Sequence, residues 1–281
     1  MSRSFFIFLI IFNFFPVFFV YAEGSIKILL VPGHDKKSFG AQYGNTKEAD
    51  MNLVLATKIF DLLKKDKRFE VYITQNSDGY AKEFLDFYNT RASSIKTFIE
   101  SSKKNISNSF VSNGFTEKAN TPHGSADEGM VTRLYGFNKW ANENKMDAVI
   151  HVHFNDYKRK TKWKIGDRKG FTIYIPDEQF VNSENSYELA DDVFYQLKKK
   201  YKTSNYINEL GGMIYDQKLI AIGANRTLVS GVRSVLIEYG YIYEFRDAIA
   251  RRKAYEEMAG LTVEGIEKYF FKSRAELSTS Q

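Results

Sequence analysis

A small set of histidine and glutamate side chains stands at the ends of apolar segments of the sequence or at the start of a predicted helix. The set consists of His34, Glu48, His151, His153 and Glu238, with the amide side chain of Asn155 close by. Imidazole nitrogens and carboxylate oxygens are common zinc ligands, and a catalytic zinc site needs three protein ligands with one position left for water. The chain has no cysteine, which excludes thiolate zinc sites, iron–sulfur clusters, disulfides and a cysteine nucleophile. A metal centre in this chain has to be built from histidine and carboxylate.

Taken one at a time, these residues also have ordinary structural explanations. His34 follows a Pro-Gly pair and could be a turn residue, and Glu48 at a helix start would favourably oppose the helix dipole. His151 and His153 are two residues apart and so share one face of a strand, where one of them could serve only to fill the sheet. Glu238 is harder to explain in this way, because a carboxylate ending a buried apolar strand carries a desolvation cost unless it has a partner. Together, the residues favour a metal site.

The elements that must position these side chains alternate between strands and helices. Short apolar runs predict strands, and apolar positions at three- and four-residue spacing predict helices. Predicted strands cover residues 26–31, 69–74, 147–153, 170–175 and 234–238, and predicted helices cover residues 47–64, 81–100, 186–201 and 244–271. This alternation predicts an α/β fold, a single domain with a mostly parallel open sheet flanked by helices. Ligands of such sheets bind beyond the carboxyl ends of the strands, where the candidate residues stand.

The first residues of the chain have the layout of an export signal. Residues 5–20 are almost unbroken Phe, Ile, Leu and Val, they follow Arg3, and Ala22 closes a short stretch that suits a cleavage site. We expect residues 1–22 to be a secretory signal peptide, with an uncleaved N-terminal anchor as the alternative. The folded part would then be exported, and be periplasmic, associated with the cell wall or extracellular. The only membrane contact expected is through an uncleaved N-terminus.

The rest of the chain divides into one domain and two polar segments. Residues 23–271 form the expected domain. Within it, residues 101–132 are rich in Ser, Asn, Lys, Gly and Thr, which predicts a polar insertion that is either a functional lid or a loop without a role. Residues 272–281 are polar and predict a disordered tail.

The charge balance is mildly basic. Without residues 1–22, which contain only Arg3, the chain keeps 39 of its 40 basic residues and all 34 acidic ones, a formal charge of +5. An exported basic domain suits an anionic polymer such as the cell wall. The basic residues look scattered rather than grouped with aromatic residues, and export also argues against nucleic acid as a partner.

Four short motifs, in this order, resemble the zinc-dependent N-acetylmuramoyl-L-alanine amidases. They are Val31-Pro-Gly-His34, Glu48-Ala-Asp-Met-Asn52-Leu53, His153-Phe-Asn155 and Leu236-Ile-Glu238-Tyr-Gly240-Tyr241. Each motif alone is weak, but the ordered set covers about residues 26–270. The resemblance implies an α/β fold and a peptidoglycan hydrolase that cuts the amide between N-acetylmuramic acid and the L-alanine of the stem peptide.

The resemblance also implies a role for each candidate residue. His34, Glu48 and His153 would hold one zinc ion per chain, and Glu238 would act as general base and then general acid on a zinc-bound water. Asn155 and His151 would be substrate-binding residues, with His151 kept as the alternative to His153 as a ligand. An activator protein is a possible partner of such enzymes.

The chain departs from the family pattern in places. Val31 stands where an acidic residue is usual, Asp35-Lys36 replaces a glycine pair, and His151 replaces a common serine. The polar insertion falls where some relatives carry a segment that blocks the zinc, with Glu117 and Glu128 as candidates for that role. Two other readings stay open: another exported zinc peptidase acting on wall peptides, and an inactive wall-binding homologue.

Overall fold

The computed structural model describes residues 24–112, 114–116, 128–217 and 224–279. The predicted signal peptide over residues 1–22 lies outside the described residues. Among the helices that are described, none contains a stretch long and apolar enough to cross a membrane.

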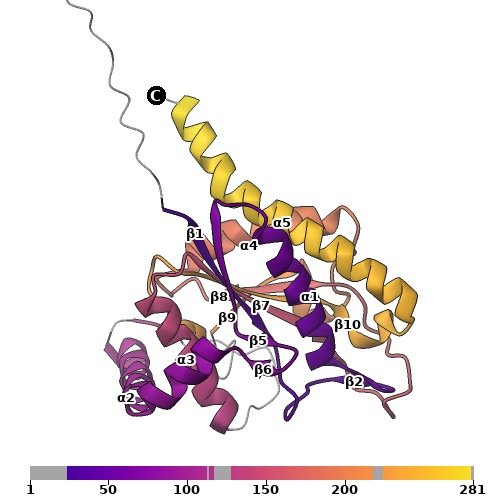
Figure 1. The fold of residues 1–281 in the computed structure, drawn as a ribbon, viewed down its shortest axis with the longest axis horizontal. Helices are drawn as coiled ribbons and strands as arrows, with labels where there is room; N and C mark the ends of the chain where they lie inside the picture. The colour runs from indigo at the N-terminus through magenta and orange to yellow at the C-terminus, as the bar shows by residue number, and fades with distance from the viewer. Residues whose placement is uncertain (1–23, 113, 117–127, 218–223, 280–281) are drawn as a thin grey trace, which may run out of the picture.

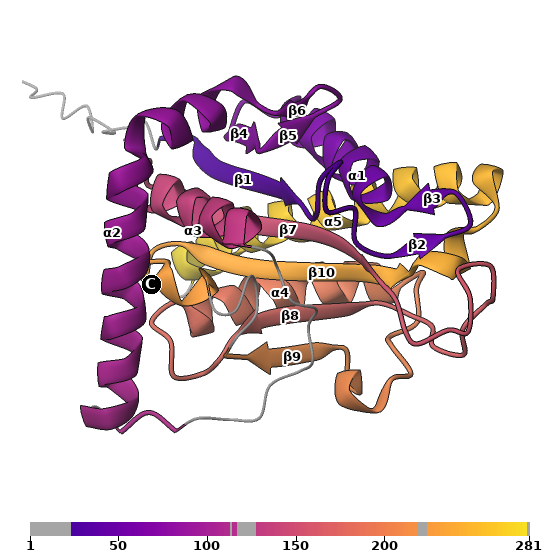
Figure 2. The same ribbon diagram turned by 90° about the horizontal axis from the view of Figure 1, so that it is seen from below.

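The centre of the domain is a six-stranded sheet with four parallel strands side by side (Figures 1 and 2). In sheet order the strands are β4 (Phe69–Ile73), β1 (Ile26–Pro32), β7 (Ala148–Asn155), β10 (Arg233–Tyr241), β8 (Thr172–Pro176) and β9 (Met213–Asp216). Strand β8 runs antiparallel to β10, and β9 runs parallel to β8. The sequence-based expectation of a single α/β domain with a mostly parallel sheet is confirmed.

Helices cover both faces of the sheet, and the strand sequences show why. Along β1, Ile28 and Leu30 face one core cluster while Leu29 and Val31 face another, as the two-residue period of a strand requires. The first cluster is completed by α1 (Glu48–Leu63), α4 (Ser183–Lys198) and α5 (Ala248–Thr279). The second is completed by α2 (Lys82–Ser112) and α3 (Glu128–Glu143). Strands buried on both faces read as continuous apolar runs.

Short elements complete the fold around the strand ends. Two small hairpins pair β2 (Gln42–Tyr43) with β3 (Thr46–Lys47), and β5 (Gln75–Asn76) with β6 (Gly79–Tyr80). The 3-10 helices are η1 (Ile207–Glu209), η2 (Ala224–Thr227) and η3 (Ile242–Phe245).

The structure differs from the sequence-based expectation at the polar segments. Helix α2 continues to Ser112 and α3 begins at Glu128, so both ends of the expected insertion at 101–132 are helical. Helix α3 was not predicted at all, although its Phe137 and Trp140 pack on Phe84 of α2. Helix α5 runs to Thr279, where a disordered tail was expected from residue 272.

Neighbouring residues of α1 provide a direct test of this packing. Leu55 is fully buried between α1 and the sheet, whereas Val54 is 42% exposed. We expect Leu55→Ala to lower the free energy of unfolding by about 2–5 kcal/mol, because it removes buried methyl groups and leaves a cavity. Val54→Ala is the control and should change it by about 0.5 kcal/mol or less. Urea unfolding curves measure both, and equal losses would contradict the packing described.

Candidate metal centre

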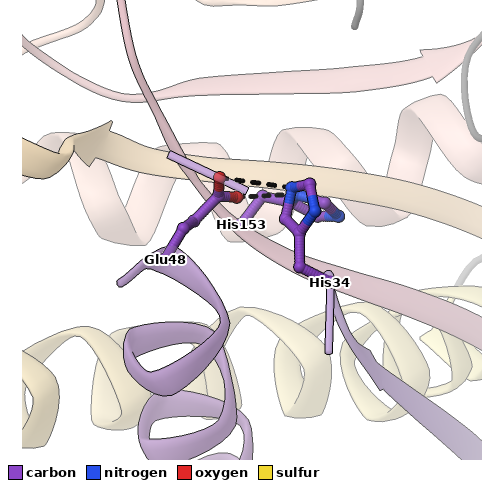
Figure 3. A group of neighbouring side chains, drawn as sticks. All are labelled: His34, Glu48 and His153. Atoms are coloured by element: carbon purple, nitrogen blue, oxygen red, sulfur yellow. Dashed lines mark hydrogen bonds and ion pairs between the residues drawn. The ribbon is translucent and has the colours of Figure 1, made fainter. Parts of the chain in front are cut away.

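Three side chains from three segments meet at the carboxyl edge of the sheet. His34 follows β1, Glu48 is the first residue of α1, and His153 lies near the end of β7. One ligand atom from each of them lies within 4.8 Å of the others. Figure 3 shows the Glu48 carboxylate directed at both imidazole rings: Oε2 lies 3.2 Å from Nε2 of His34 and Oε1 lies 3.0 Å from Nδ1 of His153. The two rings meet edge to face, with centroids 5.2 Å apart.

Backbone hydrogen bonds hold these segments together. Strands β1 and β7 are parallel neighbours, so both deliver their last residues to the same edge. The amide of Gly33 donates to the carbonyl of Val152 at 2.9 Å, and the side-chain amide of Asn52 donates to the carbonyl of Gly33, also at 2.9 Å. The Glu48 carboxylate in turn accepts a hydrogen bond from the amide of Ala41. Hydrogen bonds to backbone groups therefore fix the positions of the three segments relative to one another.

The residue before His34 is a glycine because its backbone lies very close to the ring of His153. A Cβ on Gly33 would lie 2.1 Å from the ring of His153, which is less than any real contact allows. His34 itself has a φ of 65°, in the left-handed region that non-glycine residues rarely adopt. Strained backbone of this kind is typical of functional sites.

The charges of the cluster complement one another. Burial raises the pKa of the Glu48 carboxyl, but hydrogen bonds and charge from the two imidazoles outweigh burial and hold this pKa well below its usual range. Burial lowers the pKa of His34, yet the hydrogen bond and charge of Glu48 together leave that pKa raised. An ionised carboxylate between two imidazoles matches the donor set of a catalytic zinc site. The residues present therefore fit a zinc ion.

Glu238 lies beside this cluster without belonging to it. It is on β10, in register with His153 of β7, just before the point where the pairing of the two strands shifts by a bulge. Its side chain is 9% exposed, and Oε2 has no hydrogen-bond partner among the described residues. Burial first, and then the charges of Glu48 and Glu209, raise the pKa of Glu238 well above its ordinary value. A buried carboxyl with such a pKa is a typical proton-transfer group.

The structure separates the two histidines that the sequence left as alternatives. His153 joins the cluster and His151 does not. His151 is 1% exposed, its Nε2 has no hydrogen-bond partner among the described residues, and burial together with His153 lowers its pKa to about 3. It is therefore a neutral side chain within the sheet. Of the two candidates for a blocking carboxylate, Glu128 is exposed at the start of α3 and outside the cluster, and Glu117 lies outside the described residues.

Asn155 is held in place by a residue that the sequence did not reveal. Its side-chain nitrogen donates to Oε1 of Glu209 at 2.8 Å, and its side-chain oxygen accepts from the amide of Asp156. Glu209, at the end of η1, is 2% exposed. Besides Asn155, four hydroxyl groups donate to its carboxylate: those of Thr172, Tyr174, Ser204 and Tyr241. No motif marks Glu209 in the sequence, because its partners come from separate strands and loops.

The contact between Gly33 and His153 provides a test that needs only metal binding. We expect Gly33→Ala to weaken zinc affinity about 10- to 100-fold, because the added methyl group must displace the His153 ring. Gly231→Ala is the matched control, since a Cβ there meets nothing within 4 Å. Calorimetric titration of the metal-free protein with zinc measures both, and equal affinities would contradict the geometry described.

The hydrogen bonds to Glu209 provide a second test, on stability. Glu209→Ala should lower the free energy of unfolding by about 3 kcal/mol or more, because it leaves several buried donors without an acceptor. Glu209→Gln keeps the shape and one acceptor oxygen, and we expect a smaller loss. Glu256→Ala is the control: among the described residues, this exposed side chain forms an ion pair only with Lys58, so the loss should be about 1 kcal/mol or less. Urea unfolding measures all three, and a loss for Glu209→Ala no larger than the control's would argue against the network.

Comparisons with known proteins identify a family for this chain. The family model described as N-acetylmuramoyl-L-alanine amidase matches residues 28–268. No curated protein sequence matches the chain.

Solved structures show the same fold at low sequence identity. An N-acetylmuramoyl-L-alanine amidase of Clostridium difficile 630 is 17% identical, with a TM-score of 0.54 over 88% of this chain and 97% of that one. The amidase AmiC2 of Nostoc punctiforme is 19% identical, with a TM-score of 0.52 over 88% and 98%. The CwlD amidase of Clostridioides difficile, solved in complex with the GerS lipoprotein, is 18% identical, with a TM-score of 0.54 over 87% and 98%. With a family model matched over nearly all of the described domain, the chain belongs to the N-acetylmuramoyl-L-alanine amidase family.

Proposed function

We propose that this chain hydrolyses the amide between N-acetylmuramic acid and L-alanine in peptidoglycan, as an exported, zinc-dependent amidase. Residues 23–271 would be its catalytic domain, and residues 1–22 its signal peptide. The observation that carries the proposal is the buried carboxyl of Glu238 beside the His34–Glu48–His153 cluster. A proton-transfer group next to a metal-type donor set is what amide hydrolysis requires.

In this proposal His34, Glu48 and His153 hold the metal. When bound, zinc supplies a Lewis acid for the amide carbonyl and lowers the pKa of a coordinated water. Glu48 already has its carboxylate ionised between the two imidazoles, so it can accept a cation without losing a proton. The ring of His153 lies directly against the backbone of Gly33, which limits the positions that the ring can take.

Glu238 would be the group that moves the proton. In its ionised form Glu238 would take a proton from the attacking water, and the same oxygen would then deliver it to the nitrogen of the leaving L-alanine. The free Oε2 suits this task, because no described side chain or backbone group competes for it. The bulge that follows Glu238 in β10 re-aims the strand at this point, as bulges beside active sites commonly do.

Asn155 would orient the substrate. A side-chain amide nitrogen carries two hydrogens, and one of them is given to Glu209. The second can donate to an oxygen of the bound substrate. Glu209 thus keeps Asn155 in one rotamer, which is how a supporting residue contributes to a preorganised site. An activator protein, by analogy with the GerS lipoprotein bound to CwlD, remains a further proposal for this chain.

Purified protein provides the test of this function. We expect one zinc ion per chain and release from peptidoglycan of stem peptides with a free N-terminal L-alanine, and a chelator should stop the release. Glu238→Gln should lower the rate about 100- to 10,000-fold while zinc stays bound, since only proton transfer is removed. His34→Ala should lose the zinc itself. Zinc content by elemental analysis and products by mass spectrometry measure these effects.

The outcome that would contradict the proposal is equally specific. Wild-type rates in Glu238→Gln would remove Glu238 from the reaction. Cleavage within the stem peptide, with no new N-terminal L-alanine, would identify a peptidase instead. Glu256→Gln, at an exposed position away from the cluster, is the control that should keep both zinc and activity.

A further inference from the structure

A strongly basic loop connects β7 to β8 at the edge of the sheet that carries the cluster. This basic loop, residues 156–170, contains seven lysine or arginine residues and two aspartates, a net charge of +5. Residues 23–281 together also carry a formal charge of +5, so the rest of the domain is neutral on balance. The net charge of the domain therefore equals that of this one loop, which groups basic residues around Trp163, although most of the other basic residues are scattered along the chain.

Arg159 gives the basic loop a fixed shape. Its side chain is 5% exposed and binds the Asp156 carboxylate with two nitrogens, at 2.8 and 2.6 Å. Its guanidinium also donates to the carbonyl oxygens of Thr161, Lys162 and Lys164, and to that of Gln42 in hairpin strand β2. A loop whose carbonyls converge on one buried guanidinium is preorganised, so little conformational entropy is lost when it binds a partner.

The lysines of the basic loop have the opposite arrangement. Five of them are exposed, and within the described part of the chain none forms an ion pair: Lys158, Lys160, Lys162, Lys164 and Lys169. Several like charges held close together repel one another unless an anion lies between them. The arrangement therefore favours a partner that carries several negative charges.

Apolar side chains are interleaved with these lysines. Trp163 is 61% exposed and Ile165 is 48% exposed, on either side of Lys164. The Trp163 ring lies against Gly44, where a Cβ would come within 2.5 Å of it, and the Lys162 ammonium lies over the ring, 5.7 Å from its centroid. An aromatic ring presented in this way offers a flat apolar face together with a polar N–H.

The basic loop lies next to the metal cluster. The amide of Gly44 donates to the carbonyl of Lys162 at 3.0 Å, which joins the loop to the β2–β3 hairpin. That hairpin leads directly into α1, whose first residue is Glu48. Figure 2 shows the hairpin and the start of α1 at the end of the sheet where β1 and β7 terminate. A shallow hollow of about 560 Å³ lies between Gln42 and residues 156–162.

We propose that the basic loop is a binding subsite for the peptidoglycan strand, with its lysines on carboxylates of the stem peptides and Trp163 against a sugar ring. The inference rests on the proposed function for the identity of the polymer. A polymer bound along the loop would be anchored beside the cluster by many weak contacts, and its local concentration at the cluster would rise accordingly.

A membrane surface is the competing partner, since tryptophan and lysine also meet lipid headgroups. The position of the loop argues against it. A bilayer lying flat on the basic loop would cover the edge of the sheet at which His34 and His153 stand, whereas a linear polymer can reach that edge.

Binding to intact polymer tests the proposal separately from catalysis. The experiment measures co-sedimentation with insoluble peptidoglycan. It uses the full chain in mild detergent, loaded with zinc and carrying Glu238→Gln, so that the peptidoglycan stays uncut. The loop variant combines K160Q, K162Q and K164Q. The control variant combines K65Q, K67Q and K145Q, three exposed lysines that also lack ion pairs among the described residues and remove the same charge.

We expect the loop variant to bind peptidoglycan about tenfold more weakly at low salt, with a smaller further loss as salt is raised, because the screened interactions are already gone. The control variant should bind like the parent. Trp163→Ala should weaken binding at low and high salt alike. Amidation of the peptidoglycan carboxylates should weaken binding of the parent protein, which has an unchanged basic loop. The remaining binding should equal that of the loop variant to untreated peptidoglycan.

Three results would overturn the proposal. One is equal binding by the loop and control variants. A second is unchanged binding to amidated peptidoglycan. A third is weaker binding of the loop variant only to phosphatidylglycerol nanodiscs, which would make the loop a membrane contact. Failure of the proposed function looks different: the chain with Glu238 intact would release no stem peptides, whatever the basic loop binds.

Discussion

The site depends on one constraint, the burial of the Glu48 carboxylate between two imidazoles. Glu48 is only 4% exposed, and a buried carboxylate is costly unless it is paired. The pairing requires β1 and β7 to end at the same edge and α1 to begin there, so that His34, Glu48 and His153 meet. It also requires glycine at position 33, because any side chain there would occupy the space of the His153 ring. Topology and local sequence are thus tied to a single ion pair network.

Three buried carboxylates around this edge are stabilised in three different ways. Glu48 is balanced by imidazoles, and Glu209 accepts hydrogen bonds from neutral hydroxyl and amide groups. Glu238 has neither, and its pKa is raised. Environments that differ this much allow groups of the same chemistry to serve separately as ligand, support and proton carrier. The three environments follow from the partners of each carboxylate and not from its residue type.

Much of this arrangement could be predicted from the sequence, for identifiable reasons. Continuous apolar runs indicated β1, β7 and β10, because strands buried on both faces have no polar alternation. The candidates His34, His153 and Glu238 were then found at the ends of those runs. Glu209 could not be found, since its partners are distant in sequence. Helix α3 was hidden by its polar start, and the antiparallel direction of β8 has no signal in a single sequence. Domain boundaries and residue roles remain predictions.

Helix α5 packs against α1, the helix that begins with Glu48. Met258 and Ile266 of α5 lie in the same core as Leu55 of α1, and Lys58 pairs with Glu256 across the two helices. Helix α5 therefore helps to hold α1, and with it Glu48, against the sheet. Five buried apolar positions of α1 share this core with α5: Met51, Leu55, Ala56, Ile59 and Leu63. A substitution on the core face of α5 can therefore shift the start of α1, although no described residue of α5 belongs to the cluster.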